Sequence, residues 1–173
     1  MTSGDGERAA AQARRHEAFV GLGANLGDRV AALDTALAAL AALPATTLVA
    51  RSSFYESAPV DAPGDDYLNA VAQLDTALTP LALLTALQAI ESQQGRERPF
   101  SNAPRTLDLD LLLYGEVVFD SPELTLPHPR LHQRAFVLVP LAEIAPTLVV
   151  PTHGAIADLI GGVATQRIAK LKR

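Results

Sequence analysis

The chain has 173 residues and a mass of 18.2 kDa, a length that favours one domain with a core of its own. Apolar residues make up 49% and charged residues 19%, which excludes a disordered or fibrous protein, and the lack of cysteine excludes disulfide scaffolds and thiolate chemistry. The net charge of −5 argues against a mainly nucleic-acid-binding role. Because the only lysines are Lys170 and Lys172, cationic chemistry before them rests on arginine.

The two ends of the chain are predicted to be polar. Residues 1–17 lack the apolar segment of a signal peptide, so we predict a flexible N-terminal extension followed by one folded domain over 18–173. Residues 167–173 are predicted to be a short basic surface segment. No run of about 18 uncharged apolar residues occurs, so no membrane span is expected.

Hydrophobic periodicity predicts six main elements. Apolar residues at steps of three and four indicate helices, whereas alternating or β-branched segments indicate strands. Thr79 and Pro80 are suited to an N-cap and first turn, and Pro44 and Gly95 end the two helices. The expected elements are a strand around 19–23 that ends in the glycine-rich turn GLGANLGD, a helix over 30–40, strands over 46–56 and 67–76, a helix from 80, and a strand over 107–114.

The order of these elements is β-α-β-β-α-β, which is typical of ferredoxin-like folds. We therefore expect a single α/β (α+β) domain with this core and additional C-terminal strands and helices. Those additions include a helix near 134–144 and a terminal helix after Thr152. The glycine spacing of GLGANLG and the absence of lysine before residue 170 exclude a phosphate-binding P-loop.

Two aspartates form the strongest local signal. Residues two apart in a strand face the same way with Cα atoms about 6.6 Å apart, so Asp108 and Asp110 can present two carboxylates to one space. The leucines at 107, 109, 111 and 113 are then expected to face the core on the other side. A hard divalent cation such as Mg²⁺ suits such a pair. A solvated strand face with no metal is the alternative.

Basic residues cluster around this pair in the sequence. Arginine forks suit phosphate groups, so the cluster favours phosphoryl transfer that depends on positioning and electrostatics. An ordinary mixed-charge surface is the alternative, because acidic residues are equally frequent there. The basic residues are Arg96, Arg98, Arg105, His128, Arg130, His132 and Arg134.

Three further residues are candidates for binding a flat ligand. Tyr67 and Phe136 offer aromatic faces, although either could be a plain core residue. Asn69 shares a strand face with Tyr67 and has both a donor and an acceptor, as the edge of a heteroaromatic ring requires.

Six segments, in this order and spacing, closely resemble the 6-hydroxymethyl-7,8-dihydropterin pyrophosphokinase family. They are FVGLGANLGD, SSFYESAPV, DYLNAV, QAIESQQGRER, PRTLDLDLLLYG and LPHPRLHQRAFVLVPLAEIAP. The resemblance covers roughly residues 18–160. It implies transfer of pyrophosphate from ATP to the pterin hydroxymethyl group, two Mg²⁺ ions, and a ferredoxin-like, cytoplasmic monomer with ATP and the pterin as its partners and no nucleic-acid or membrane partner.

The resemblance also implies roles for individual residues. Asp108 and Asp110 would bind both magnesium ions, and Arg96 and Arg105 would act on the phosphates as catalytic residues. The implied ATP contacts are Gln88, Glu91, Arg98, Leu111, Thr125, His128 and Arg134. The implied pterin contacts are Tyr67 and Phe136 on its two faces, Asn69 at its edge, and Ser57, Ala58 and Val60 in a lining loop.

One segment departs from the family pattern. Many members have RWGPR before TLDLD, whereas this chain has SNAPR, so Phe100 or Asn102 would have to substitute for the tryptophan that helps to seal the site. Two other function classes remain open on the residues alone. A ferredoxin-like module that binds RNA or a small molecule would not need the aspartate pair, and a metal-dependent nuclease or other phosphotransferase would not need the Tyr67, Asn69 and Phe136 set.

Overall fold

The computed structural model describes residues 14–59, 66–94 and 107–172. Its centre is a six-stranded antiparallel sheet in the order β10-β3-β4-β1-β5, with β2 also paired to β4. The elements are β1 (His16–Ala24), α2 (Arg29–Ala41), β2 (Thr46–Arg51), β3 (Tyr55–Ser57), β4 (Tyr67–Thr76), α3 (Pro80–Gln93), β5 (Asp108–Tyr114), β6 (Phe119–Asp120), β7 (Thr125–Leu126), a 3₁₀ turn (Leu131–Gln133), α4 (Ala135–Ile144), β8 (Val149–Val150), β9 (Gly154–Ala155), α5 (Ile156–Gly161) and β10 (Ile168–Lys170).

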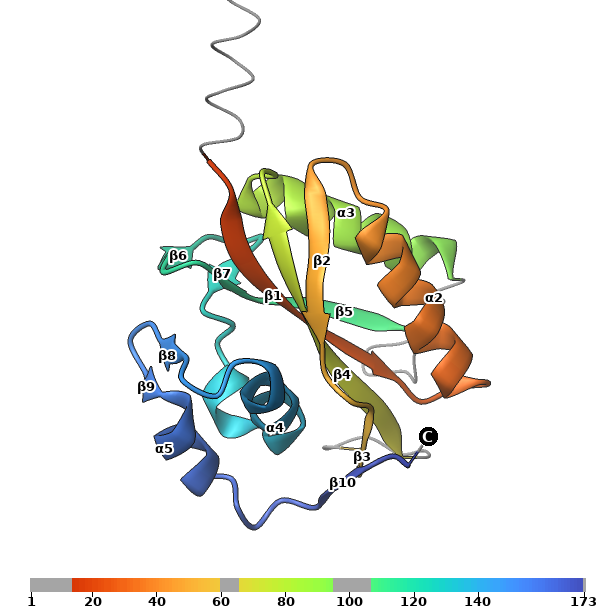
Figure 1. Ribbon diagram of the computed structural model, residues 1–173, viewed down its shortest axis with the longest axis vertical. Helices are drawn as coiled ribbons and strands as arrows, with labels where there is room; N and C mark the ends of the chain where they lie inside the picture. Colours follow the sequence, from red (N-terminus) through yellow and green to blue (C-terminus); the bar gives the residue numbers. More distant parts are fainter. Residues whose placement is uncertain (1–13, 60–65, 95–106, 173) are drawn as a thin grey trace, which may run out of the picture.

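The predicted β-α-β-β-α-β core is confirmed. Helices α2 and α3 cover one face of the sheet, and α4 and α5 lie on the other face (Figure 1). The N-cap prediction for α3 is confirmed too, because the Thr79 side chain accepts a hydrogen bond from the Ala82 N–H. In the described segments, no helix is long and apolar enough to cross a membrane.

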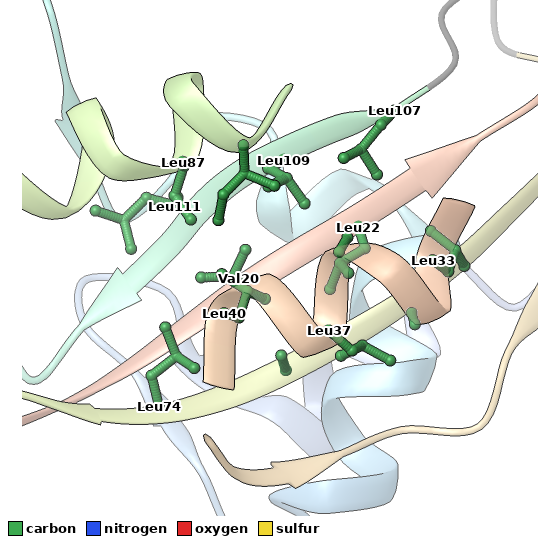
Figure 2. Close-up of a cluster of buried hydrophobic side chains, with 14 of the residues drawn as sticks. Val20, Leu22, Leu33, Leu37, Leu40, Leu74, Leu87, Leu107, Leu109 and Leu111 are labelled. Atoms are coloured by element: carbon green, nitrogen blue, oxygen red, sulfur yellow. The ribbon is translucent and has the colours of Figure 1, made fainter. Parts of the chain in front are cut away.

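Two apolar clusters lie on the two faces of the sheet. The first fills the space under α2 and α3, where Leu33, Leu37 and Leu40 of α2 meet strand residues such as Val20 and Leu22 (Figure 2). The second lies under α4 and includes Val71, Leu112, Leu113, Leu138 and Leu141. Burial on both faces explains the continuous leucine run at the end of β5.

A bulge in β5 changes one core prediction. Phe19 of β1 is opposite Leu113 and Val20 is opposite Leu111, so Leu112 is an extra residue on β5. The first three predicted core leucines belong to the cluster under α2 and α3, but Leu113 lies in the cluster under α4. The prediction that all four leucines share one face is therefore wrong for Leu113, because the bulge shifts the alternation.

The predicted strand over 46–56 is divided into β2 and β3. Both pair with the same edge of β4, β2 beside its C-terminal end and β3 beside its N-terminal end. Ser52 lies at the break, where its N–H donates to the Val71 carbonyl at 2.9 Å and its hydroxyl accepts from the Val71 N–H at 2.9 Å. The serine side chain thus replaces one backbone partner of β4 and allows the strand to bend without an unsatisfied group.

Both ends of the domain differ from the predictions. Strand β1 begins at His16, so His16 and Glu17 pair with β4 and do not belong to an extension; residues 1–13 lie outside the described residues. The C-terminal segment is not only a basic surface segment, because Ile168–Lys170 forms β10 on the edge of β3. Local periodicity indicated neither the first residues of β1 nor β10, since their pairing partners are distant in sequence. The terminal helix after Thr152 is the short α5, which follows the β8-β9 hairpin.

Candidate active site

Asp108 and Asn69 lie on one row across three strands, and Asp110 lies on the next row of the same face. Asp108 of β5 is opposite Gly23 of β1, and Gly23 is opposite Asn69 of β4. Residues directly opposite in antiparallel strands point to the same face of a sheet. That face is the α4 face, because Leu109 and Leu22, the alternate neighbours, lie in the cluster under α2 and α3.

Glycines leave the middle of this row without side chains. Gly21 is opposite Asp110 and Gly23 is opposite Asp108, so β1 places no side chain of its own beside the carboxylates; at Gly21, the Leu112 side chain lies 3.4 Å from where a Cβ atom would be. A Cβ atom at Gly23 would lie 3.4 Å from the Asn69 Oδ1 and 3.7 Å from the Tyr67 Cδ1. Gly23 is buried, and Asn69 and Tyr67 lie within van der Waals distance of this position, so the glycine lets both side chains lie close to the β1 backbone.

Strands β3 and β4 place the predicted pterin residues beside this space. The Asn69 Nδ2 donates to the Ser57 Oγ at 2.7 Å, and both residues are buried. Tyr67 is half-buried and directly opposite Ser57 in the register of β3 and β4. Ala58 is exposed just after β3. The bond to Ser57 leaves the Asn69 side chain in one orientation, with its carbonyl oxygen near Gly23.

Glu91 supports the strand that carries the aspartates. Strand β5 is an edge strand, and the outward N–H of Leu109 donates to the Glu91 Oε2 at 2.9 Å. Glu91 is only 3% exposed, so this buried carboxylate of α3 takes the place of the missing neighbouring strand. Because Leu109 lies between Asp108 and Asp110, the contact also fixes the position of both aspartates.

Replacing Glu91 with alanine is expected to destabilise the domain by about 1–3 kcal/mol, because the buried Leu109 N–H would lose its acceptor. Glu91→Gln retains an oxygen acceptor, so it is expected to lower the free energy of unfolding by less than Glu91→Ala does. Urea unfolding of both variants measures the difference. Equal losses for the two variants would show that the negative charge matters more than the hydrogen bond to Leu109.

His128 and Arg134 lie near the aspartates. The His128 N–H donates to the Leu112 carbonyl of β5 at 2.9 Å, and its Nδ1 accepts from the Arg130 N–H at 3.2 Å, so the Nε2 carries the proton of the neutral ring. Burial, with Arg134 and Arg130, lowers the pKa of His128 to about 4 against the opposing effect of Asp108. Burial also lowers the pKa of Arg134, whereas the nearby Asp110 and Asp108 carboxylates act to raise it.

The lowered pKa of His128 predicts a pH-dependent stability of the free protein. Between pH about 4 and about 6.5 the unfolded chain binds this proton and the folded chain does not, so stability should increase with pH across this window. Melting temperatures at pH 4.5 and 7, in EDTA and without nucleotide, should therefore differ less for His128→Asn than for the unsubstituted protein. The same pH difference in both proteins would contradict the lowered pKa.

Helix α4 places Phe136 and Arg134 together over the α4 face. The Arg134 Cζ lies 5.3 Å from the centre of the half-buried Phe136 ring, a cation–π distance. At the other end of α4, the Glu143 carboxylate accepts hydrogen bonds from the Ser53 N–H, the Ser53 hydroxyl and the Tyr55 hydroxyl. These bonds tie α4 to the segment that contains β3 and so set the position of Phe136 relative to the sheet.

Several predicted site residues are not part of the group that Asp108, Asp110, Asn69 and Phe136 form on the α4 face. Leu111 is 3% exposed and its side chain lies in the cluster under α2 and α3, so only its backbone could meet a ligand. Gln88 is exposed on α3, and the Thr125 hydroxyl donates to the Asp120 carboxylate at 3.1 Å. Six residues named from the sequence lie outside the described residues: Val60, Arg96, Arg98, Phe100, Asn102 and Arg105.

The sequence-based reasoning missed two features of the site. The strand predicted over 19–23 includes Gly21 and Gly23, but nothing local indicated that these glycines lie opposite the two aspartates; the turn glycine after β1 is Gly27, with φ +63°. No local pattern in the sequence indicated a role for Glu143, because that role depends on hydrogen-bond partners about 90 residues earlier in the chain.

A cavity of about 660 Å³ lies elsewhere, between α4, the β2-β3 break and the C-terminal end. None of the predicted site residues that the structure describes lines it; its described walls are Arg51, Ser52, Ser53, Phe54, Glu143, Lys170, Leu171 and Lys172. The chemistry of the Asp108 row therefore identifies the site better than cavity size does. The row spans three strands, β5, β1 and β4.

Comparisons with known proteins agree with this geometry. Residues 19–146 match the model of the family described as 7,8-dihydro-6-hydroxymethylpterin-pyrophosphokinase (HPPK). The chain is 47% identical over 156 residues to a 2-amino-4-hydroxy-6-hydroxymethyldihydropteridine pyrophosphokinase of Haemophilus influenzae, covering 89% of this chain and 97% of that protein. A Pseudomonas aeruginosa protein of the same name is 46% identical over 155 residues, covering 88% and 95%.

A solved structure supports the fold. A Plasmodium falciparum HPPK-DHPS protein superposes with a TM-score of 0.69 at 15% identity, covering 85% of this chain. This chain spans 45% of that longer protein, so the match concerns one part of it. The family match over 19–146 includes Asp108, Asp110, Asn69 and Phe136, the residues that the fold brings to one face. The chain therefore belongs to the 7,8-dihydro-6-hydroxymethylpterin-pyrophosphokinase family.

Proposed function

We propose that this chain transfers the pyrophosphoryl group of ATP to the hydroxymethyl group of 6-hydroxymethyl-7,8-dihydropterin, in folate biosynthesis. The hydroxyl oxygen attacks the β-phosphorus, the bond from that phosphorus to the oxygen it shares with the α-phosphate breaks, and AMP leaves with that oxygen. The hydroxyl proton is released. The observation that carries this proposal is the row that brings Asp108 of β5 and Asn69 of β4 to one face of the sheet, on either side of Gly23.

The donor set fits magnesium. Asp108 and Asp110 are half-buried carboxylates on one face of β5, opposite Gly23 and Gly21 of β1. In the described part of the chain, no group of three or more His, Asp or Glu residues could form a closed metal site. Mg²⁺ typically needs only one or two carboxylates, with phosphate oxygens and waters completing its shell. We propose that these two aspartates hold two Mg²⁺ ions, which would neutralise charge on the ATP phosphates.

The remaining roles in binding and catalysis are proposed for side chains of the protein itself. We propose that Arg134 and the Nε2–H of His128, which lie near the carboxylates, donate to phosphate oxygens, and that Arg96 and Arg105 stabilise the transferring group. Asn69 and Ser57 would bind the pterin edge, with Tyr67 and Phe136 on its faces and Ala58 and Val60 at its side. The reaction then needs positioning more than covalent chemistry.

The proposal has a direct test. The purified chain is incubated with Mg²⁺, ATP and the hydroxymethyl-dihydropterin, and the products are separated by chromatography. AMP and the pterin pyrophosphate should form in equal amounts. Formation of ADP would instead indicate transfer of one phosphoryl group, and no turnover together with pterin binding would favour a non-catalytic binding module. We further propose a cytoplasmic monomer with no nucleic-acid or membrane partner.

A further inference from the structure

Arg29 connects the ends of two strands that flank the proposed pterin subsite. It is the first residue of α2. Its Nη1 donates to the Asp66 carbonyl at 2.8 Å, just before β4, and its Nη2 donates to the Glu56 Oε1 at 3.1 Å, in β3. One planar guanidinium thus holds β3 and β4 together at the point where they separate.

Each partner of Arg29 is next to a residue proposed to bind the pterin. Glu56 precedes Ser57, and Asp66 precedes Tyr67. Ser57 and Tyr67 are the last opposite pair of β3 and β4, so beyond them the described part of the ladder offers no further pairing. The spacing of these two residues therefore depends on what holds the strands at this end.

The contact is better suited to positioning than an ordinary surface ion pair. The side chains of Arg29 and Glu56 are 29% and 37% exposed, and the arginine uses two nitrogens on two separate groups. A fork with two partners restricts both distance and angle. Arg167 also reaches the Asp66 carboxylate, at 3.1 Å, but its side chain is 73% exposed, so this second contact is expected to contribute little.

We propose that Arg29 is a positioning residue for pterin binding, because it sets the separation of Ser57 and Tyr67 through the ends of β3 and β4. This inference rests on the pterin role proposed above for Ser57, Tyr67 and Asn69. Among the described residues, the hydrogen-bond partners of Arg29 are Asp66 and Glu56, and neither belongs to the ATP side of the site, where Asp108 and Asp110 lie on β5. Its loss should therefore affect the two substrates differently.

The chain contains a matched control at the opposite end of β4. The Arg15 Nε donates to the Asp75 carboxylate at 3.0 Å, and its Nη2 donates to the Asp75 carbonyl at 3.1 Å and to the Thr47 hydroxyl at 3.4 Å. The Arg15 side chain is 33% exposed, against 29% for Arg29, and it too donates to a carboxylate and to a backbone carbonyl. Neither Asp75 nor Thr47 is adjacent to a proposed site residue.

The experiment compares Arg29→Met with Arg15→Met. Dissociation constants for the pterin and for a non-hydrolysable ATP analogue with Mg²⁺ are measured separately, together with melting temperatures. Arg29→Met should raise the pterin Kd about tenfold, roughly the effect of one charged hydrogen bond, and change the ATP-analogue Kd less than about twofold. Arg15→Met should change both dissociation constants less than about twofold, even if it lowers the melting temperature as much as Arg29→Met does.

Two further variants test whether Arg29 acts on pterin binding through its contact with Glu56. Arg29→Lys retains the charge but not the fork, so its pterin Kd should lie between those of Arg29→Met and the unsubstituted protein. Glu56→Gln should weaken pterin binding in the unsubstituted protein but add little in Arg29→Met, because both changes break the same contact.

Equal pterin constants for Arg29→Met and Arg15→Met would overturn the inference, as would equal rises in the pterin and ATP-analogue constants, which indicate a general structural defect. Failure of the proposed pterin site has a different signature. If Phe136→Ala and Tyr67→Ala leave pterin binding unchanged, the subsite itself is wrong. If these variants lose pterin binding and Arg29→Met does not, only the role of Arg29 is wrong.

Discussion

Replacing Asp108 with asparagine is expected to lower kcat/KM by at least about 10³-fold, on the order of 4 kcal/mol of transition-state stabilisation. Asparagine has the same shape, so the half-buried position on β5 should retain its packing while it loses its negative charge. Without that charge, the pair with Asp110 holds a divalent cation much less tightly. Chelation of Mg²⁺ by EDTA should abolish turnover of the unsubstituted protein in the same assay.

Asp158→Asn is the control for this substitution. Asp158 is an exposed aspartate in the first turn of α5, far along the chain from β5, and its loss should leave kcat/KM within about twofold. Initial rates at several Mg²⁺ concentrations measure both variants. Near-normal turnover of Asp108→Asn at saturating Mg²⁺ and ATP would exclude the assignment of this aspartate as a metal ligand.

Replacing Phe136 with alanine is expected to weaken pterin binding by about 10- to 100-fold, since a stacked aromatic face contributes about 1–3 kcal/mol. Phe136 is half-buried at the start of α4, on the face of the sheet where Asn69 lies. The ring also supports Arg134 at 5.3 Å, so a small loss of ATP affinity is expected as well. Isothermal titration with each substrate separates the two effects.

Phe136→Leu is the matched variant for this prediction. Leucine retains apolar packing against the cluster under α4 but lacks an aromatic face. We therefore expect it to unfold at nearly the normal temperature and still to bind the pterin several-fold more weakly than the unsubstituted protein. If pterin affinity falls only in Phe136→Ala and in proportion to its lower melting temperature, the ring serves packing and not stacking.

Elements with strong local signals were predicted well from the sequence. Strand β4 has the predicted bounds Tyr67–Thr76, and α3 begins at Pro80 after its Thr79 cap. In both cases the information lies within a few residues, as alternation in the strand and as a capping side chain at the helix start. The pairing of Asp108 and Asp110 on one face followed from the same period of two.

Elements that depend on distant partners were predicted poorly. The division of β2 from β3 depends on Ser52 and Val71, and β10 exists because Ile168–Lys170 meets the open edge of β3. The bulge at Leu112 is set by its fit to β1. None of these contacts leaves a pattern within a single segment, so propensity and periodicity could not reveal them.

The sequence by itself determined the family, the order of the elements and the carboxylate pair, because motif spacing and strand alternation are local properties of the chain. Only the tertiary structure decided which residues meet. The antiparallel register brings Asp108, Gly23 and Asn69 into one row, although Gly23 and Asn69 are 46 residues apart in sequence and Asn69 and Asp108 are 39 residues apart. Contacts such as Glu91 with Leu109 and Arg29 with Glu56 arise from packing, since each side chain finds its partner only after the sheet has formed.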